Sequence, residues 1–191
     1  MPRKLTYYVG ATLDGFIAGS QGEIDFFPIE QDVVEWIAAE YPETLPTHAR
    51  QALGIDAPNS RFDCVVQGRA TYGMGLDEGI TSPFAHLDQY VVSSSLGTSP
   101  DPAVTVIAND PLGAVKDLKR GDGLGVWLAG GGSVAGQLVS EIDELVVKSY
   151  PVAIGAGVPM FRDVSGPVQL ELTNTLALPG GTVVSVYSRP D

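Results

Sequence analysis

The chain has 191 residues, of which 44% are hydrophobic, and a formal net charge of -12 at pH 7. This length and apolar content predict one compact domain over residues 1–191 with a substantial core. The acidity argues against a nucleic-acid partner, because binding to a phosphate backbone depends on Lys and Arg side chains, which are few here.

Strand-like and helical patterns alternate along most of the chain. Helical spacing of apolar residues predicts helices over 30–41, 111–118 and 133–139, with a short helix after Thr71. The turn residues from Leu178 to Gly181 predict a hairpin. We therefore expect an α/β fold whose mostly parallel sheet ends in an antiparallel pair and has helices on both faces. The expected strands are 5–11, 63–67, 89–93, 104–107, 125–129, 144–150, 168–175 and 182–189.

No apolar run approaches the roughly 20 residues of a membrane span, and the first strand-like residues follow directly on a short polar start. We expect a cytoplasmic protein without a membrane partner. Its single cysteine, Cys64, excludes an internal disulfide, and apolar neighbours place it in a buried strand. The residues suggest no metal cluster, and His48 and His86 stand apart in the sequence.

Two polar clusters follow strand-like segments. In the first, Gly68 allows backbone to approach a phosphate, Arg69 can donate two N–H bonds to it, and Thr71 lies at a helix start. A surface arginine and a helix-capping threonine would give the same pattern. The second cluster contains Ser93 and Ser94, for which a solvated turn is the alternative.

A third cluster, Gly130 to Gly132, lies between an apolar strand and the amphipathic helical pattern that continues through Ser133 and Val134. Glycines leave backbone N–H groups open to a phosphate, and the start of a helix carries unpaired N–H donors. A tight turn explains some glycines, but three in a row exceed what a turn needs. All three clusters fall at carboxyl ends of expected strands, where open α/β sheets bind ligands.

This arrangement resembles the dihydrofolate reductase-like superfamily over essentially the whole chain. The segment from Val9 to Ala18, which contains Thr12-Leu-Asp-Gly15, and the segment from Pro151 to Phe161 look most like one branch. That branch is the C-terminal reductase domain of the bacterial riboflavin-biosynthesis deaminase/reductase. The resemblance implies a reductase that uses NADPH to transfer hydride to a small heterocycle, similar to 5-amino-6-(5-phosphoribosylamino)uracil reductase.

The resemblance also implies roles for individual residues. Gly10 and Ile17 would border the nicotinamide and ribose, and Gly68, Arg69 and Thr71 would hold the phosphates. Ser93 and Ser94 would lie near the adenosine end, with Arg69 and Ser94 close to the 2′-phosphate. Gly130, Gly131, Gly132, Ser133 and Val134 would cover the pyrophosphate, and the peptide bond between Gly130 and Gly131 is expected to be cis.

Three residues are candidates for the substrate side. Asp32 is the positional match to the carboxylate that assists protonation in dihydrofolate reductases, although the helix dipole favours an acid in a first turn without any catalytic duty. Asp14 is a candidate substrate contact, and Asp-Gly is also a turn signal. Phe27 is a candidate wall for a flat ring, and such an aromatic residue is more often part of a core.

Some residues depart from the folate enzyme. Residues 84–88 contain no arginine for a folate glutamate tail, which favours a smaller pteridine, pyrimidine or flavin-precursor substrate. Ala108 falls where a basic contact to the 2′-phosphate is expected, so the preference for NADPH rests on Arg69. The alternatives are a dihydrofolate or pteridine reductase and a non-catalytic nucleotide-binding protein that kept the cofactor cleft. By analogy with the same branch we expect a homodimer.

Overall fold

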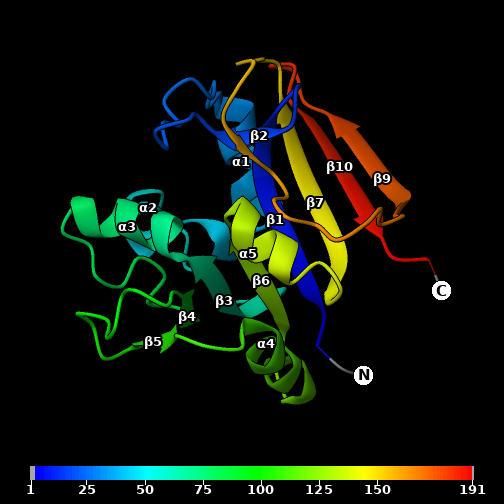
Figure 1. Ribbon diagram of the computed structural model, residues 1–191. Coiled ribbons are helices and arrows are strands. Elements are labelled where there is room, and N and C mark those ends of the chain that lie inside the picture. The colour runs from blue at the N-terminus through cyan, green and yellow to red at the C-terminus, as the bar shows by residue number, and fades with distance from the viewer. Residues whose placement is uncertain (1–2, 191) are drawn as a thin grey trace.

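The computed structural model describes residues 3–190 and is built around one large twisted sheet (Figure 1). Along the sheet the strands follow the order β5-β4-β3-β6-β1-β7-β10-β9, and β2 and β8 form a separate pair. The strands of the large sheet are β1 (Leu5–Thr12), β3 (Phe62–Gly68), β4 (Asp88–Val92), β5 (Val104–Ile107), β6 (Gly125–Gly130), β7 (Ile142–Tyr150), β9 (Glu171–Ala177) and β10 (Val183–Ser188).

The strands from β5 to β7 pair in parallel, and β10 is antiparallel to both β7 and β9. The expected mostly parallel sheet with an antiparallel C-terminal pair is therefore confirmed. The last hairpin begins at Glu171 instead of residue 168, after a loop that contains Gly166 and Pro167.

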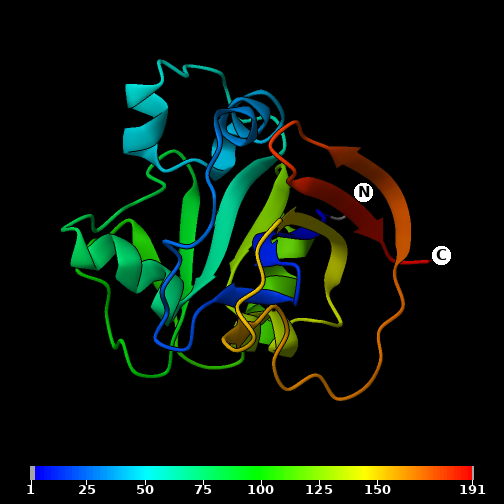
Figure 2. The same ribbon diagram turned by 90° about the horizontal axis from the view of Figure 1, so that it is seen from above.

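Helices cover both faces of the sheet (Figure 2). Within the described chain they are α1 (Gln31–Glu40), the 3₁₀ turn η1 (Pro42–Thr44), α2 (Thr47–Ala52), α3 (Arg69–Asp77), α4 (Pro111–Arg120) and α5 (Gly132–Gln137). The sequence patterns missed η1 and α2, which are short and begin at or just after a proline. They also missed the pair formed by β2 (Phe16–Ala18) and β8 (Val158–Pro159).

The alternation of side chains along β1 divides the core into two layers. Tyr7 and Val9 pack with Val115 of α4 and Val134 of α5 on one face. Tyr8 points to the opposite face and packs in an aromatic cluster with the partly buried Trp36 of α1 and other rings. Successive strand residues point to opposite faces, so β1 contributes to both layers and lies at the centre of the fold. No helix within residues 3–190 is long and apolar enough to cross a membrane.

Glu43 in η1 connects the segment after α1 to the loop before β3. It is fully buried, and its Oε1 accepts hydrogen bonds from the backbone N–H groups of Ser60 and Arg61, the latter at 2.8 Å. Burial opposes ionisation, but the N–H donors of Arg61 and Ser60 outweigh it and hold the pKa of Glu43 below its ordinary value. The ionised carboxylate therefore fixes η1, whose Thr44 lines the cleft described below.

Replacing this anchor is expected to destabilise the fold. Glu43→Gln should lower the free energy of unfolding at neutral pH by about 1–3 kcal/mol, because it removes a charged acceptor from buried donors. The folded pKa lies below the ordinary value of 4.5, so the stabilisation is present above that pH and is lost as the pH falls through the folded pKa. Urea unfolding of both proteins over this pH range measures the difference.

Glu40→Gln is the matched control, since Glu40 is half exposed in its ion pair with Arg61. It should change the free energy of unfolding by less than about 1 kcal/mol. An equal loss of unfolding free energy in both variants would contradict the role of ionised Glu43 as the anchor of η1. A Glu43→Gln loss that does not vary with pH would contradict it too.

Candidate functional site

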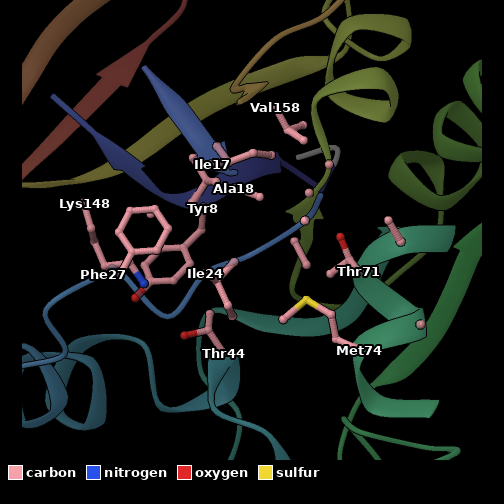
Figure 3. Close-up of a pocket in the computed structure, with 18 of the residues that line it drawn as sticks. Tyr8, Ile17, Ala18, Ile24, Phe27, Thr44, Thr71, Met74, Lys148 and Val158 are labelled. Carbon is pink, nitrogen blue, oxygen red and sulfur yellow. The ribbon is translucent and has the colours of Figure 1, made fainter. Parts of the chain in front are cut away.

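A cleft of about 690 Å³ lies over the carboxyl ends of β1, β3, β6 and β7. Figure 3 shows its two ends: Lys148 and Phe27 lie at one, and Thr71 and Met74 of α3 at the other. Ile17 and Ala18 of β2 lie between them. We call these the lysine end and the α3 end.

The α3 end brings two of the sequence clusters together. A Cβ on Gly68 would lie 3.1 Å from Val134 Cγ2 and 3.4 Å from the backbone nitrogen of Gly131, so β3 and the glycine triplet are in close contact. Thr71 Oγ1 lies 3.7 Å from the position that a Cβ on Gly130 would take. The peptide bond between Gly130 and Gly131 is cis, as the resemblance implies.

The three glycines of the triplet have different surroundings. Gly130 and Gly131 line the cleft, and the nearest atom to a Cβ on Gly131 would be Ile17 Cδ1 at 4.0 Å. Gly132 faces the other way, because a Cβ there would lie 2.1 Å from the carbonyl oxygen of Pro159. Packing against β8 thus explains Gly132 without a ligand. Neither Ser133, which is exposed, nor Val134, which packs in the core, belongs to the cleft lining.

Arg69 and Thr71 occupy the first turn of α3, after the N-cap residue Gly68. Both line the cleft, and Arg69 is exposed. Among the described residues no carboxylate forms an ion pair with Arg69. Its guanidinium is therefore available to an anion at this end of the cleft.

The serines after β4 lie outside the cleft lining. Ser93 Oγ accepts hydrogen bonds from the N–H groups of Ser95 and Leu96 at 3.3 and 3.0 Å, which forms a serine turn. Ser94 is exposed. The pairing of Gly68 with Val92 nevertheless places this turn beside the start of α3.

The two candidate aspartates hold loops together and do not line the cleft. Asp32 Oδ2 accepts a hydrogen bond from the N–H of Gly180, 2.6 Å away, in the turn between β9 and β10. Asp14 accepts from the Thr12 hydroxyl and from the N–H groups of Ile154 and Gly155, the shortest backbone bond being 2.7 Å. The Thr12 and Gly155 donors lower the pKa of Asp14. These contacts favour the turn and helix-start interpretations of both residues.

Phe27 does line the cleft, at the lysine end. Its ring centroid lies 4.9 Å from that of Tyr150, at an interplanar angle of 52°. Gly10 lies beneath this pair, because a Cβ there would lie 2.9 Å from Tyr150 Cε2. The candidates Gly10, Ile17 and Phe27 therefore share one wall of the cleft with Tyr150.

The sequence analysis missed Lys148, whose side chain enters the lysine end from β7. Lys148 is 9% exposed, and its Nζ lies 4.2 Å from the centroid of the Tyr8 ring. Burial lowers the pKa of Lys148 to about 7. The available signal was that Lys148 directly follows the apolar residues Leu145 to Val147. A buried strand does not ordinarily carry a charge.

Tyr8 is the second missed residue. Its hydroxyl is buried and lies beside the Thr44 side chain. Burial raises the pKa values of Tyr8 and Tyr150, the tyrosines at this end, so both stay neutral across the physiological range. The lysine end thus contains an amine whose pKa is about 7 and a phenol, and no carboxylate of residues 3–190 forms an ion pair with Lys148.

Removing the buried lysine should stabilise the protein in a pH-dependent way. The folded pKa of about 7 lies below the ordinary 10.5, so between these values the unfolded chain binds a proton that the folded chain does not. The destabilisation by Lys148 is therefore complete below about 7 and fades as the pH rises toward 10.5. Lys148→Met should raise the thermal midpoint most in acid and least in alkali, as measured by circular dichroism.

Lys116→Met is the control, because Lys116 is exposed and contacts Glu141. It should give no such pH-dependent gain. A Lys148→Met gain that is constant with pH would show that Lys148 keeps its ordinary pKa in the folded protein.

Comparisons with known proteins agree with this geometry. The RibD C-terminal domain family model matches residues 66–184. Uncharacterized protein YwjB of Bacillus subtilis (strain 168) is 27% identical over 179 residues, which cover 92% of each chain. Two solved structures share the fold.

One is the Thermotoga maritima diaminohydroxyphosphoribosylaminopyrimidine deaminase/5-amino-6-(5-phosphoribosylamino)uracil reductase, with a TM-score of 0.64 and 16% identity over 99% of this chain and 57% of that one. The other is Enterococcus faecalis dihydrofolate reductase complexed with NADP(H), with a TM-score of 0.65 and 17% identity over 98% and 97% of the two chains. The family match covers more than half of the sequence and includes β6 and the glycine triplet. The chain belongs to the RibD C-terminal domain family and has the reductase-like fold of that family.

Proposed function

We propose that this protein is an NADPH-dependent reductase that transfers hydride to a small flat heterocycle, similar to the reduction of 5-amino-6-(5-phosphoribosylamino)uracil. One observation carries the proposal. A single cleft joins an unpaired arginine and two open glycines at the α3 end to an aromatic wall with a buried lysine at the lysine end. Hydride transfer from a nicotinamide nucleotide to a ring requires this anionic cofactor and the acceptor ring to be held side by side.

The residues present fit such a cofactor. The cleft volume of about 690 Å³ is within the range of small-molecule sites. Gly131 has no neighbour close to its Cβ position on the cleft side, so backbone is open to a ligand there. Arg69 would hold a phosphate, and Gly10 and Ile17 would border the nicotinamide. When bound, the nicotinamide supplies the hydride.

The other side chains of the cleft position the acceptor and exclude water. Phe27 and Tyr150 form an aromatic wall, against which a flat ring can pack. Ile17 and Ile24 add apolar surface, and the loop that carries Ile24 lies along the cleft (Figure 3). Displacing water from both reacting rings would favour direct transfer between them.

The structure also supports a substrate smaller than folate. Phe84 and Leu87, in the segment where a folate tail would need a basic residue, are buried in the core. His86 between them is bonded to Thr47 and to the carbonyl oxygen of Glu43. This segment is committed to packing and leaves no cation for a glutamate tail.

The role of Arg69 gives the decisive test of cofactor binding. NADPH should bind at micromolar concentration, and Arg69→Ala should weaken it about tenfold, because a bidentate charged contact to phosphate is lost. Binding of NADH should be weaker in the wild type and less affected by the substitution. The measurement is titration followed by nucleotide fluorescence.

Arg120→Ala, which removes an exposed arginine paired with Asp117 on α4, is the matched control and should bind NADPH like the wild type. Absence of binding by either nucleotide would exclude the reductase and leave the fold intact. Binding without reduction of any pyrimidine or pteridine would favour a nucleotide-binding protein that lacks the chemistry.

We further propose a homodimer in which the outer strand of the sheet takes part. β9 is exposed along its whole length, and Leu172 on it is 56% exposed. An exposed edge strand with apolar side chains is prone to pair with another chain. A nearby apolar groove, lined in part by Val168 and Leu170, continues this surface onto the face of β7 and β10.

Leu172→Glu should therefore convert a dimer into a monomer, as measured by gel filtration with light scattering. A glutamate charge buried in the dimer interface would cost more free energy of association than the leucine contact contributes. Leu53→Glu is the control, since Leu53 is similarly exposed (51%) but is the C-cap residue of α2, which Figure 1 shows on the opposite side of the molecule from β9. A wild-type monomer, or a dimer that survives the change at Leu172, would contradict this interface.

A further inference from the structure

Three exposed apolar side chains lie along one rim of the cleft. Ile24, Ile29 and Met74 are 41%, 69% and 44% exposed, and all three belong to the cleft lining. Single exposed apolar residues are common on protein surfaces, whereas several gathered around one cleft are typical of a ligand-binding groove. We call these three residues the apolar rim.

The apolar rim is formed by two separate segments of the chain. Ile24 and Ile29 belong to the loop between β2 and α1, and Met74 lies in the second turn of α3. Figure 3 shows the Ile24 and Met74 side chains pointing into the same space. Phe27 and Leu45 also line the cleft, and both pack against one core cluster. The rim therefore extends the apolar surface that begins at the aromatic wall.

The rim side chains do not stabilise the fold by packing in its core. None of the three belongs to a hydrophobic core cluster within residues 3–190. An apolar group of a bound ligand would remove their surface from water, which favours binding. The rim thus favours a ligand that carries an apolar substituent in addition to its flat ring.

The charges of the lining disfavour an anionic substituent at the rim. Asp77, the last residue of α3, is the carboxylate of the lining and is exposed. Within residues 3–190 it forms no ion pair. Lys148 lies at the lysine end, and Arg69 lies along α3, with Nη1 3.0 Å from the position that a Cβ on Gly73 would take. In the proposed function Arg69 holds a cofactor phosphate, so the bound cofactor adds negative charge on this side of the cleft.

We propose that the apolar rim and Asp77 select a substrate whose flat ring carries an uncharged apolar substituent, and that they exclude one whose substituent ends in a phosphate or carboxylate. This inference names the substrate class of the reductase and so rests on the proposed function. It keeps the flat ring of 5-amino-6-(5-phosphoribosylamino)uracil and replaces the phosphorylated tail. An anion beside the rim would lose water without gaining a cation, and Asp77 would repel it.

Three pterins that differ in one substituent test the selection. Pterin has none at ring position 6, 6-phenylpterin has an apolar one, and 6-(4-carboxyphenyl)pterin adds a carboxylate to the same phenyl group. Binding is measured by quenching of pterin fluorescence, with and without saturating NADP⁺. The wild type should bind 6-phenylpterin at least about tenfold more tightly than pterin, because the phenyl group is buried against the rim. The carboxylate should cancel this gain, most strongly when NADP⁺ is bound.

Separate variants test the charge and the apolar surface. Asp77→Lys should raise the affinity for 6-(4-carboxyphenyl)pterin severalfold, whereas Asp117→Lys, the same charge change at an exposed site on α4, should behave like the wild type. Met74→Ser should reduce the gain from the phenyl group severalfold. Leu53→Ser, at a similarly exposed site outside the lining, should leave that gain unchanged. Thermal melting establishes that each variant is folded.

The inference is overturned if the wild type binds none of the three pterins, binds 6-phenylpterin no better than pterin, or binds the carboxylate as tightly as the phenyl compound. It is also overturned if Met74→Ser keeps the full gain from the phenyl group or Asp77→Lys keeps the full discrimination against the carboxylate.

NADPH titration separates these results from failure of the proposed function. A preference for 6-phenylpterin without NADPH binding would support the apolar rim and exclude the reductase. NADPH binding without the preference would retain the reductase and remove the rim from substrate selection.

Discussion

The whole cleft depends on the close approach of β3 and β6 at their carboxyl ends. Gly68 has a hydrogen where any side chain would press on Val134 and on the backbone of Gly131. Because β3, β6 and β1 are neighbours in a parallel sheet, this contact sets the start of α3 and the glycine triplet side by side. Arg69 and Thr71 then reach the same space as Gly130 without any special loop. Backbone packing shapes this edge of the sheet.

The sequence predicted the architecture well because its signals are local. Alternation and helical spacing located every strand of the large sheet within a few residues, and the turn at Leu178 to Gly181 located the hairpin. Short elements such as η1 and β8 were missed, since they depend on contacts with distant segments. Glu43 fixes η1 through Ser60 and Arg61, which no local pattern reveals.

The lining of the cleft was predicted in part, for the same reason. Arg69 and Gly131, which lie beside glycines at strand ends, were predicted to line it because the motif and the position coincide. Asp14 and Asp32 were singled out from position alone, and their partners Gly155 and Gly180 lie far along the chain. Lys148 was missed because its environment is created by Tyr8 on another strand. A site made by pairing between strands becomes visible only when the register is known.

The carbonyl oxygens that crowd α5 have a consequence for comparing related chains. A Cβ on Gly132 would meet the carbonyl oxygen of Pro159, and one on Gly136 would lie 1.7 Å from that of Arg162. Both glycines are therefore required by the packing of the segment Pro159 to Arg162 against α5, whether or not a nucleotide binds. If a relative also has Gly132 and Gly136, this indicates only that the same segment packs against α5. Arg69 and Lys148 face the cleft without such a packing demand, so they distinguish a relative with the same ligands from one that shares the fold alone.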